Sequence, residues 1–333
     1  MMRARANMGR RRILVITAAL AVTFIAAGGA MITRAASLAP VATLAADPID
    51  VCAKAGTLDL PGGTTVPVWG FARLDAGQGC ADVTPRVPGP VLDVPVGTSV
   101  TITVHNDLAE AVSLELPGQT VAQDVPEAPP GGTASFSFTA SAPGTYLYAS
   151  PNNAGRQRAM GLYGALIVRP ATAGRAYDDA ASAFDAEKVL VLSAVDPAFN
   201  ASPDAFDTRT FAPTYWLIDG KAYPDTDPIN AGTVGAGRRV LLRYVNAGFD
   251  NSSMALLGVR ERVLARDAHP LSNPFSAVAE TIPAGSTTDA IVEVSAPGRY
   301  PLYNRQLHIT NGSAALGSPG YWPGGMLTYI TGQ

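Results

Sequence analysis

Short runs of alternating apolar and polar residues recur from about residue 48 to the end of the chain, separated by turns rich in proline and glycine. Val100, Ile102 and Val104 alternate with polar residues, and Phe136 and Phe138 do the same between serines and threonines. A period of two is typical of strands that bury one face. The 33 glycines and 27 prolines among 333 residues argue against a helical bundle or a coiled coil. The pattern therefore predicts an all-β fold made of β-sandwiches.

A second series of strand-like runs follows a small, polar segment that begins after Pro170. The runs lie at 188–193, 215–218, 240–245, 262–265, 290–294 and 327–330. We expect the intervening segment to be a linker with at most one helical turn. The predicted division of the chain is a leader with a spacer at 1–47, a first sandwich at 48–170, a linker at 171–186 and a second sandwich at 187–333.

The two halves show a loose internal similarity. Each has a strand that begins after a glycine and ends at an asparagine, from Gly97 to Asn106 and from Gly237 to Asn246. Each also has a Pro-Gly turn before an aromatic strand, at 143–146 and at 297–300. Repetition of this kind predicts that one sandwich has been duplicated.

Five arginines precede an uncharged apolar run at residues 13–32. Twenty apolar residues are enough for a helix that crosses a bilayer, and the positive charges place the preceding end in the cytoplasm. A cleavable signal peptide has the same features, so both interpretations stay open. Either one predicts an exported body, which is membrane-anchored facing outside or released to the periplasm or exterior after cleavage.

The predicted export decides how the two cysteines, Cys52 and Cys80, are interpreted. In an oxidising compartment we expect them to form a structural disulfide, with free thiols or a metal role as the alternatives.

The charges are nearly balanced, with 24 Lys and Arg against 27 Asp and Glu. The absence of a basic stripe argues against a nucleic-acid partner.

The order of several motifs resembles the cupredoxin domains of multicopper oxidases over about residues 50–333. The motifs in the first half lie at 88–90, 94–98, 104–108, 144–148 and 161–168, and those in the second half lie at 217–221, 239–248, 282–285, 297–300 and 307–312. The resemblance implies two tandem cupredoxin-like Greek-key β-sandwiches that follow the N-terminal signal or anchor helix.

The copper ligands of that family do not carry over to this chain. The family has a His-X-His-Gly motif where this chain has residues 115–118, and a second His-X-His where it has residues 149–151. The degenerate ligand positions are Glu115, Pro117, Ala149 and Pro151. Alternation along a strand explains why His-X-His matters, because residues i and i+2 point to the same face. A proline side chain has no donor atom for copper.

The number of possible ligands points the same way. A blue copper site needs a cysteine thiolate and two histidines, and the family's trinuclear cluster uses eight more histidines. This chain has three histidines and no cysteine after position 80. We therefore predict no catalytic, cofactor-binding or metal-binding residue, and copper only if a partner chain supplies ligands.

The remaining donor groups are interpreted as structural. His105 and His308 are placed on the polar faces of strands, and His269 is placed in a turn. Glu115 is expected to be an exposed or salt-bridged carboxylate, with a lone cation site as the alternative. Three methionines are expected to pack in the core rather than to form a Cu(I) site. They are Met160, Met254 and Met326.

The leading hypothesis is an exported or membrane-anchored multicopper oxidase-like protein without copper sites of its own. It would serve as a binding or assembly module, or as a partner of a copper-bearing oxidase subunit or an envelope protein. One alternative is a divergent copper-dependent oxidoreductase that uses O2, with its ligands completed by another chain. A second alternative is a structural β-domain protein of the cell envelope. The leading hypothesis favours a protein that is not itself an enzyme; if it is one, multicopper-oxidase-type oxidoreductase chemistry is expected.

Overall fold

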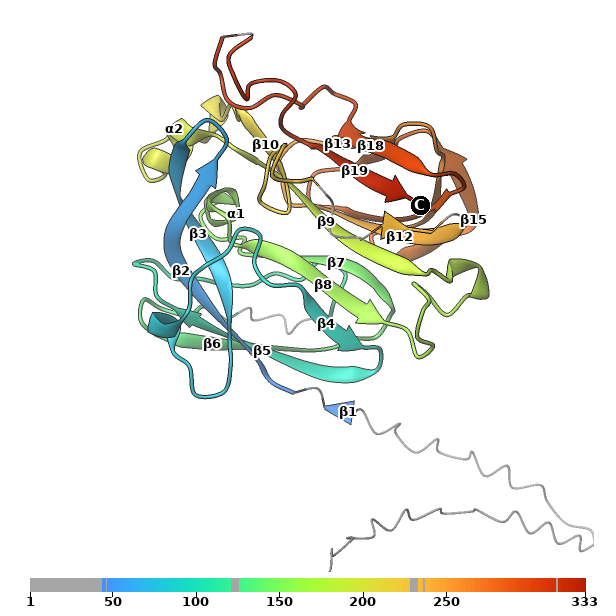
Figure 1. Ribbon diagram of the computed structural model, residues 1–333. Coiled ribbons are helices and arrows are strands. Elements are labelled where there is room, and N and C mark those ends of the chain that lie inside the picture. Colours follow the sequence, from blue (N-terminus) through green and yellow to red (C-terminus); the bar gives the residue numbers. More distant parts are fainter. Residues whose placement is uncertain (1–43, 46, 121–125, 228–232, 236, 316) are drawn as a thin grey trace, which may run out of the picture. The chain divides into compact units, whose positions relative to one another are not determined.

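The computed structural model describes residues 44–333 except 46, 121–125, 228–232, 236 and 316 (Figure 1). The predicted membrane or signal segment at 13–32 lies outside these residues. Among the described residues, no helix is both long enough and apolar enough to cross a membrane. The α-helices of this part are two five-residue elements, α1 (Arg156–Met160) and α2 (Pro197–Ala201). The predicted all-β class is confirmed.

The first sandwich consists of a five-stranded and a three-stranded sheet. The larger sheet contains β1 (Leu44–Ala45), β5 (Thr98–Asn106), β2 (Ile49–Leu60), β3 (Thr64–Leu74) and β6 (Thr133–Thr139). The smaller sheet contains β4 (Leu92–Pro95), β8 (Tyr163–Arg169) and β7 (Gly144–Ala149). Because β2 runs parallel to β5 and β4 runs parallel to β8, the chain must cross between sheets rather than meander.

The second sandwich has a six-stranded and a five-stranded sheet. The six-stranded sheet contains β10 (Tyr215–Ile218), β9 (Ala186–Val195), β12 (Arg238–Asn246), β17 (Thr287–Val294), β14 (Glu261–Arg266) and β15 (His269–Ala277). The five-stranded sheet contains β11 (Thr233–Val234), β19 (Leu327–Gly332), β18 (Gly298–Asn304), β13 (Ser252–Leu256) and β16 (Glu280–Ile282). The strands predicted for this half all lie within β9, β10, β12, β14, β17 and β19.

Burial along the strands follows the sequence pattern where one face meets solvent. In β6 every second residue is buried, and in β5 the buried residues likewise alternate with exposed or half-buried ones. In contrast, every residue of β7 is buried. Its second face packs against the other sandwich, where Leu147 and Ala149 join Val191 and Val245 in one apolar cluster. Figure 1 shows β7 and β8 beside β9 and β12.

The segment at 171–186, predicted as a linker, packs closely against the second sandwich. Ala176 and Tyr177 are buried there, and Asp179 caps a short 3-10 turn at Ala180–Ser182 by accepting a hydrogen bond from a backbone N–H. The Tyr177 hydroxyl donates to Asp289 in β17 at 2.5 Å. The proposed domain boundaries stay a prediction, but this connection is held in place by contacts.

The two halves repeat the same local hydrogen bonds, in agreement with the internal similarity of the sequence. Asn106 Nδ2 donates to two backbone carbonyls, and its Oδ1 accepts from the N–H two residues ahead. Asn246 repeats this set at 2.8–3.1 Å. The hydroxyls of Tyr146 and Tyr300 each donate to the carbonyl four residues earlier, at 2.9 and 2.8 Å. Each asparagine therefore fixes the loop that leaves its strand.

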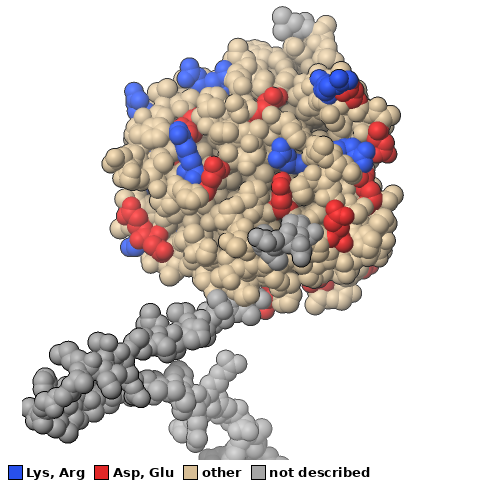
Figure 2. All heavy atoms as spheres, turned by 180° about the vertical axis from the view of Figure 1, so that it is seen from behind, with Lys and Arg blue, Asp and Glu red and all other residues tan. Residues whose placement is uncertain are grey.

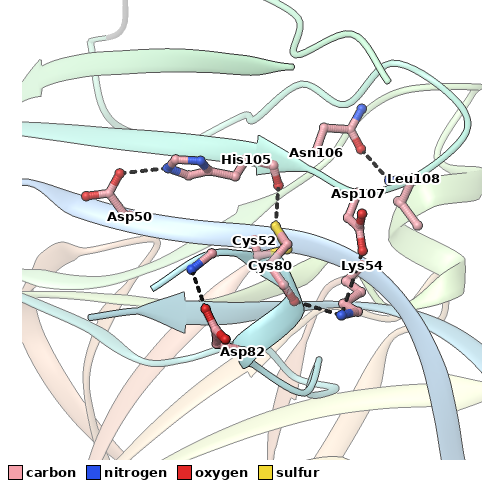
Figure 3. The surroundings of a disulfide bond; sticks show 10 residues. Asp50, Cys52, Lys54, Cys80, Asp82, His105, Asn106, Asp107 and Leu108 are labelled. Carbon is pink, nitrogen blue, oxygen red and sulfur yellow. Dashed lines mark hydrogen bonds and ion pairs between the residues drawn. A yellow bond between two sulfur atoms is a disulfide. The ribbon is translucent and has the colours of Figure 1, made fainter. Parts of the chain in front are cut away.

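Cys52 and Cys80 form the predicted disulfide, with their Cα atoms 5.5 Å apart (Figure 3). Cys52 is fully buried in β2, and Cys80 begins a 3-10 turn. Lys54 Nζ donates to the Cys80 carbonyl at 2.7 Å, which holds the turn against β2. A stable disulfide is typical of an oxidising compartment and is consistent with export.

Strand β15 forms one edge of the six-stranded sheet and pairs only with β14 among the described strands. The register changes within it, since Phe275 is opposite Val263 while Pro270 is opposite Ala265. Residues 271–274 therefore bulge out of the ladder. Pro270 and Pro274 have no N–H to donate, which suits an edge strand.

Candidate functional site

Two of the four degenerate ligand positions are neighbours in the structure. Glu115 and Ala149 form an isolated antiparallel bridge, with N···O distances of 2.8 and 3.1 Å. Ala149 is buried at the end of β7, Glu115 is half-buried, and Pro117 and Pro151 are exposed. These positions offer one carboxylate, one methyl group and two proline rings. They do not fit redox copper, which prefers imidazole and thiolate ligands in such sites.

A hydrogen-bond network lies directly behind this bridge. Ser150 is fully buried, and its hydroxyl donates to Gln157 Oε1 at 2.6 Å. Gln157 is also buried, and its Nε2 donates to the Ala111 carbonyl at 2.9 Å and to Glu110 Oε2 at 3.2 Å. The polar groups that follow β7 are therefore bonded to one another, as buried polar groups usually must be.

Glu110 anchors the start of α1 through a two-pronged ion pair. Arg156 Nη2 lies 3.0 and 2.8 Å from its two carboxylate oxygens, and Asn153 also donates to it. The other terminal nitrogen of Arg156 pairs with Asp204 at 2.6 Å. Since Asp204 belongs to the segment after α2, Arg156 links the two sandwiches at this point.

Arg158 lies two residues further along α1. Its guanidinium carbon is 4.4 Å from the centre of the Phe249 ring, a cation–π contact. Burial lowers the pKa of Arg158, and the negative charge of Glu115 opposes that change. The charge of Glu115 therefore acts on Arg158 from a distance, because the two side chains do not form an ion pair.

The three histidines lie in separate surroundings. His105 Nε2 is 2.9 Å from Asp50 Oδ1 between β5 and β2, and His269 Nδ1 is 2.7 Å from the Asp267 carbonyl. The His308 ring stacks on Trp216 with centroids 4.4 Å apart. Within the described part of the chain, no three His, Cys, Asp or Glu side chains are grouped so as to hold a metal ion.

The expectation of a polar strand face at His308 was wrong. Residues 305–310 form no strand; Leu307 has a positive φ of 64° and is 65% exposed, whereas His308 is half-buried. Stacking on Trp216 shields part of the His308 ring from solvent, and this burial lowers its pKa, while the charge of Asp250 acts in the opposite direction. The expectation for Met160, Met254 and Met326 is confirmed, because all three are buried in the core.

A cavity that was not predicted from the sequence lies between α1 and the segment around α2. Its volume is about 180 Å3, and the rings of Phe199, Phe211 and Phe249 form much of its wall. Phe211 is edge-on to both neighbours, with centroids 5.5 and 5.9 Å apart. The sequence feature that could have indicated this cavity is the group of phenylalanines at 199, 206 and 211, in a segment otherwise rich in turn-forming residues.

A larger groove of about 1130 Å3 lies where the first sandwich meets the second. Its lining has both signs of charge, including the ion pair of Lys188 with Asp219 at 2.8 Å. Figure 2 shows basic and acidic residues interspersed on one face, with most of that face neither. No single-sign field is evident on this face that would attract a highly charged partner.

The chain is similar to copper proteins in sequence and in structure. Residues 73–173 match the family model described as multicopper oxidase. The multicopper oxidase MmcO of Mycobacterium tuberculosis is 25% identical over 257 residues, which cover 65% of this chain and 48% of that protein. Laccase-3 of Oryza sativa subsp. japonica is 26% identical over 263 residues, 73% of this chain and 45% of that protein. The chain thus spans about half the length of these curated relatives.

Among solved structures, the blue copper oxidase from Nitrosomonas europaea aligns with a TM-score of 0.72 at 23% identity and covers 85% of both chains. The copper nitrite reductase from the same organism aligns with a TM-score of 0.65 at 20% identity, covering 85% of this chain and 93% of that one. At these identities the likeness establishes the cupredoxin-like fold and leaves activity to be argued from the residues.

Proposed function

Because residues 73–173 match the family model described as multicopper oxidase, we propose that the protein is a cupredoxin-type binding or assembly module that works without a copper centre of its own. Its partner would be a copper-bearing oxidase subunit or another envelope protein outside the cytoplasm. The disulfide between Cys52 and Cys80 supports that location.

The observation that carries the proposal is the chemistry at the degenerate ligand positions. Glu115 and Ala149 face each other across a backbone bridge, and Ser150 is bonded to Gln157. Two prolines complete the set, and the whole chain contains three histidines. A redox copper site needs several imidazoles within one coordination sphere, and neither the count nor the placement of these side chains provides them.

The rest of the fold is retained although the ligand motifs are replaced. The apolar cluster between β7 and β9 joins the two sandwiches, and paired polar residues replace the ligand motifs around α1. A fold kept while its metal ligands are replaced can serve other purposes, since function depends on the site rather than on the architecture.

The test is copper analysis of the purified full-length chain after incubation with Cu(I) and with Cu(II), followed by removal of unbound metal. We expect less than one copper per chain, no intense visible absorption and no oxygen consumption with an electron donor. The Glu115→Ala variant is the matched control, and it should retain the same trace of copper.

Stoichiometric copper together with oxygen consumption by the chain alone would overturn this proposal. Oxygen consumption that arises only when the chain is mixed with a histidine-rich partner, and that fails in Glu115→Ala, would favour the divergent oxidase with shared ligands instead.

A further inference from the structure

We propose that the cavity between α1 and α2 binds a small neutral molecule with a single aromatic ring. This role is separate from the proposed function and does not depend on it. The cavity is lined by three phenylalanines, by Ala154, Gly155 and Ala159, and by the side chains of Arg156 and Thr208. Ligand sites occur preferentially where two domains meet, and this cavity lies at such a junction.

The size of the cavity sets the size of the ligand. Protein interiors contain few voids larger than a water molecule, whose share of liquid volume is about 30 Å3. This cavity has a volume of about 180 Å3. An apolar cavity of about 150 Å3 in another protein is known to accept benzene. The space therefore suits one six-membered ring with a short substituent.

The walls favour an aromatic ligand. Phe199 is 1% exposed at the base, whereas Phe249 is 41% exposed at the rim. Phe211 is inclined at 85° to the first ring and at 76° to the second. Edge-to-face pairs are favourable beyond simple burial of area, so a further ring can add to the same pattern.

The charges around the cavity favour a neutral ligand. Arg156 is the charged residue in the lining, and its two terminal nitrogens are paired with Glu110 and Asp204 at 2.8 and 2.6 Å. Within the lining, a ligand carboxylate or ammonium would therefore be desolvated without gaining a free counter-charge; the Arg158 guanidinium, 4.4 Å from the centre of the Phe249 ring, is not part of the lining. Thr208, an exposed residue of the lining, carries a hydroxyl that can hydrogen-bond to one hydroxyl on the ligand.

Small residues keep the cavity open. Gly155 has a positive φ of 84°, and a Cβ atom at this position would lie 3.2 Å from the Phe249 ring. Ala159 forms the same wall one turn further along. A larger side chain at position 159 would fill the space without removing any aromatic ring.

The test is calorimetric titration of the purified full-length chain with benzyl alcohol, benzoate and benzylammonium. We expect one benzyl alcohol per chain and affinities for the two charged analogues that are at least about tenfold weaker. The Ala159→Leu variant should weaken benzyl alcohol binding by at least about tenfold. The control is Ala201→Leu, at an exposed position outside the lining, which should change the affinity by less than about twofold.

A second variant guards against a folding defect in Ala159→Leu. Phe249→Ala removes the exposed ring at the rim and should also weaken binding, with cooperative thermal unfolding retained. The proposal is overturned if benzyl alcohol does not bind, if Ala159→Leu binds as tightly as the unaltered protein, or if benzoate binds as well as benzyl alcohol.

Discussion

At the scale of the residue, the most unusual side chain is Glu261 at the start of β14. It has no exposed surface, and its Oε1 accepts a hydrogen bond from the Tyr244 hydroxyl at 3.2 Å. Burial raises its pKa to about 8, the hydrogen bond from Tyr244 opposes that rise, and the nearby charge of Glu280 adds to it. The carboxyl is therefore protonated in the folded protein at neutral pH.

This burial makes stability depend on pH. Below the ordinary glutamate pKa of 4.5, both the folded and the unfolded state hold the proton. Between that value and about 8, the unfolded state releases the proton while the folded state retains it, so the free energy of unfolding falls by about 1.4 kcal/mol per pH unit. We expect Glu261→Gln to remove this decline in urea denaturation between pH 5 and 8.

The control for this prediction is Glu293→Gln, at an exposed position of β17, which should keep the decline of the unaltered protein. An equal slope in Glu261→Gln and in the unaltered protein would show that this carboxyl is not the cause. The sequence offered no sign of this residue, because a single glutamate before an apolar strand is ordinarily exposed. In the folded chain this carboxyl contacts Tyr244 of β12, 17 residues earlier, and no local sequence pattern indicates that contact.

At the scale of the element, the turn after β10 brings the two sandwiches into close contact. Gly220 has a positive φ of 74°, and a Cβ atom there would lie 1.8 Å from the Val87 carbonyl oxygen. The turn therefore tolerates glycine alone, both for its backbone conformation and for the space. A side chain would push the turn away from the loop before β4.

We expect Gly220→Ala to lower the free energy of unfolding by about 2–4 kcal/mol, as the sum of backbone strain and overpacking. Gly97→Ala is the matched control, because its φ is 81° but no atom lies within 4 Å of the added Cβ. It should lose only about 1 kcal/mol. Equal losses in chemical denaturation would mean that the contact with Val87 contributes nothing.

Elements with one solvent-facing side could be predicted from the sequence. The alternation in β5 and β6 gave both their type and their buried face. The expectation for His308 was wrong because the alternation at 306–310 covers only five residues, and a loop can carry so short a pattern as well as a strand can. The aromatic cavity could not be predicted, since Phe249 reaches it from a position 38 residues beyond Phe211.

At the scale of the whole described fold, a buried polar cluster connects the sandwiches. Arg243 has no exposed surface, and its Nη1 donates to Thr145 Oγ1 in β7 at 2.9 Å. It also pairs with Glu187 at 2.9 Å and with Asp289 at 3.3 Å. Asp289 in turn accepts from the Thr145 hydroxyl at 2.6 Å. These bonds cross between β7 of the first sandwich and β12 and β17 of the second.

We expect Arg243→Met to lower the free energy of unfolding by about 3–5 kcal/mol, because it leaves the buried Asp289 carboxylate without a counter-charge. Adding Asp289→Asn should recover part of that loss, as measured by a double-mutant cycle in guanidinium chloride. Arg209→Met is the control: it breaks an exposed pair with Asp207 and should cost less than about 1 kcal/mol. If the losses in free energy of unfolding caused by Arg243→Met and Asp289→Asn simply add, the two side chains are not coupled and the prediction is wrong.

The edge strand β15 has a consequence for how copies of the protein behave together. An open strand edge is a template on which a second chain can add, and repeated addition gives fibrils. Pro270 and Pro274 each remove one backbone N–H from this edge, and the bulge at 271–274 interrupts its ladder. This border of the sheet is therefore a poor template for the addition of further copies of the chain.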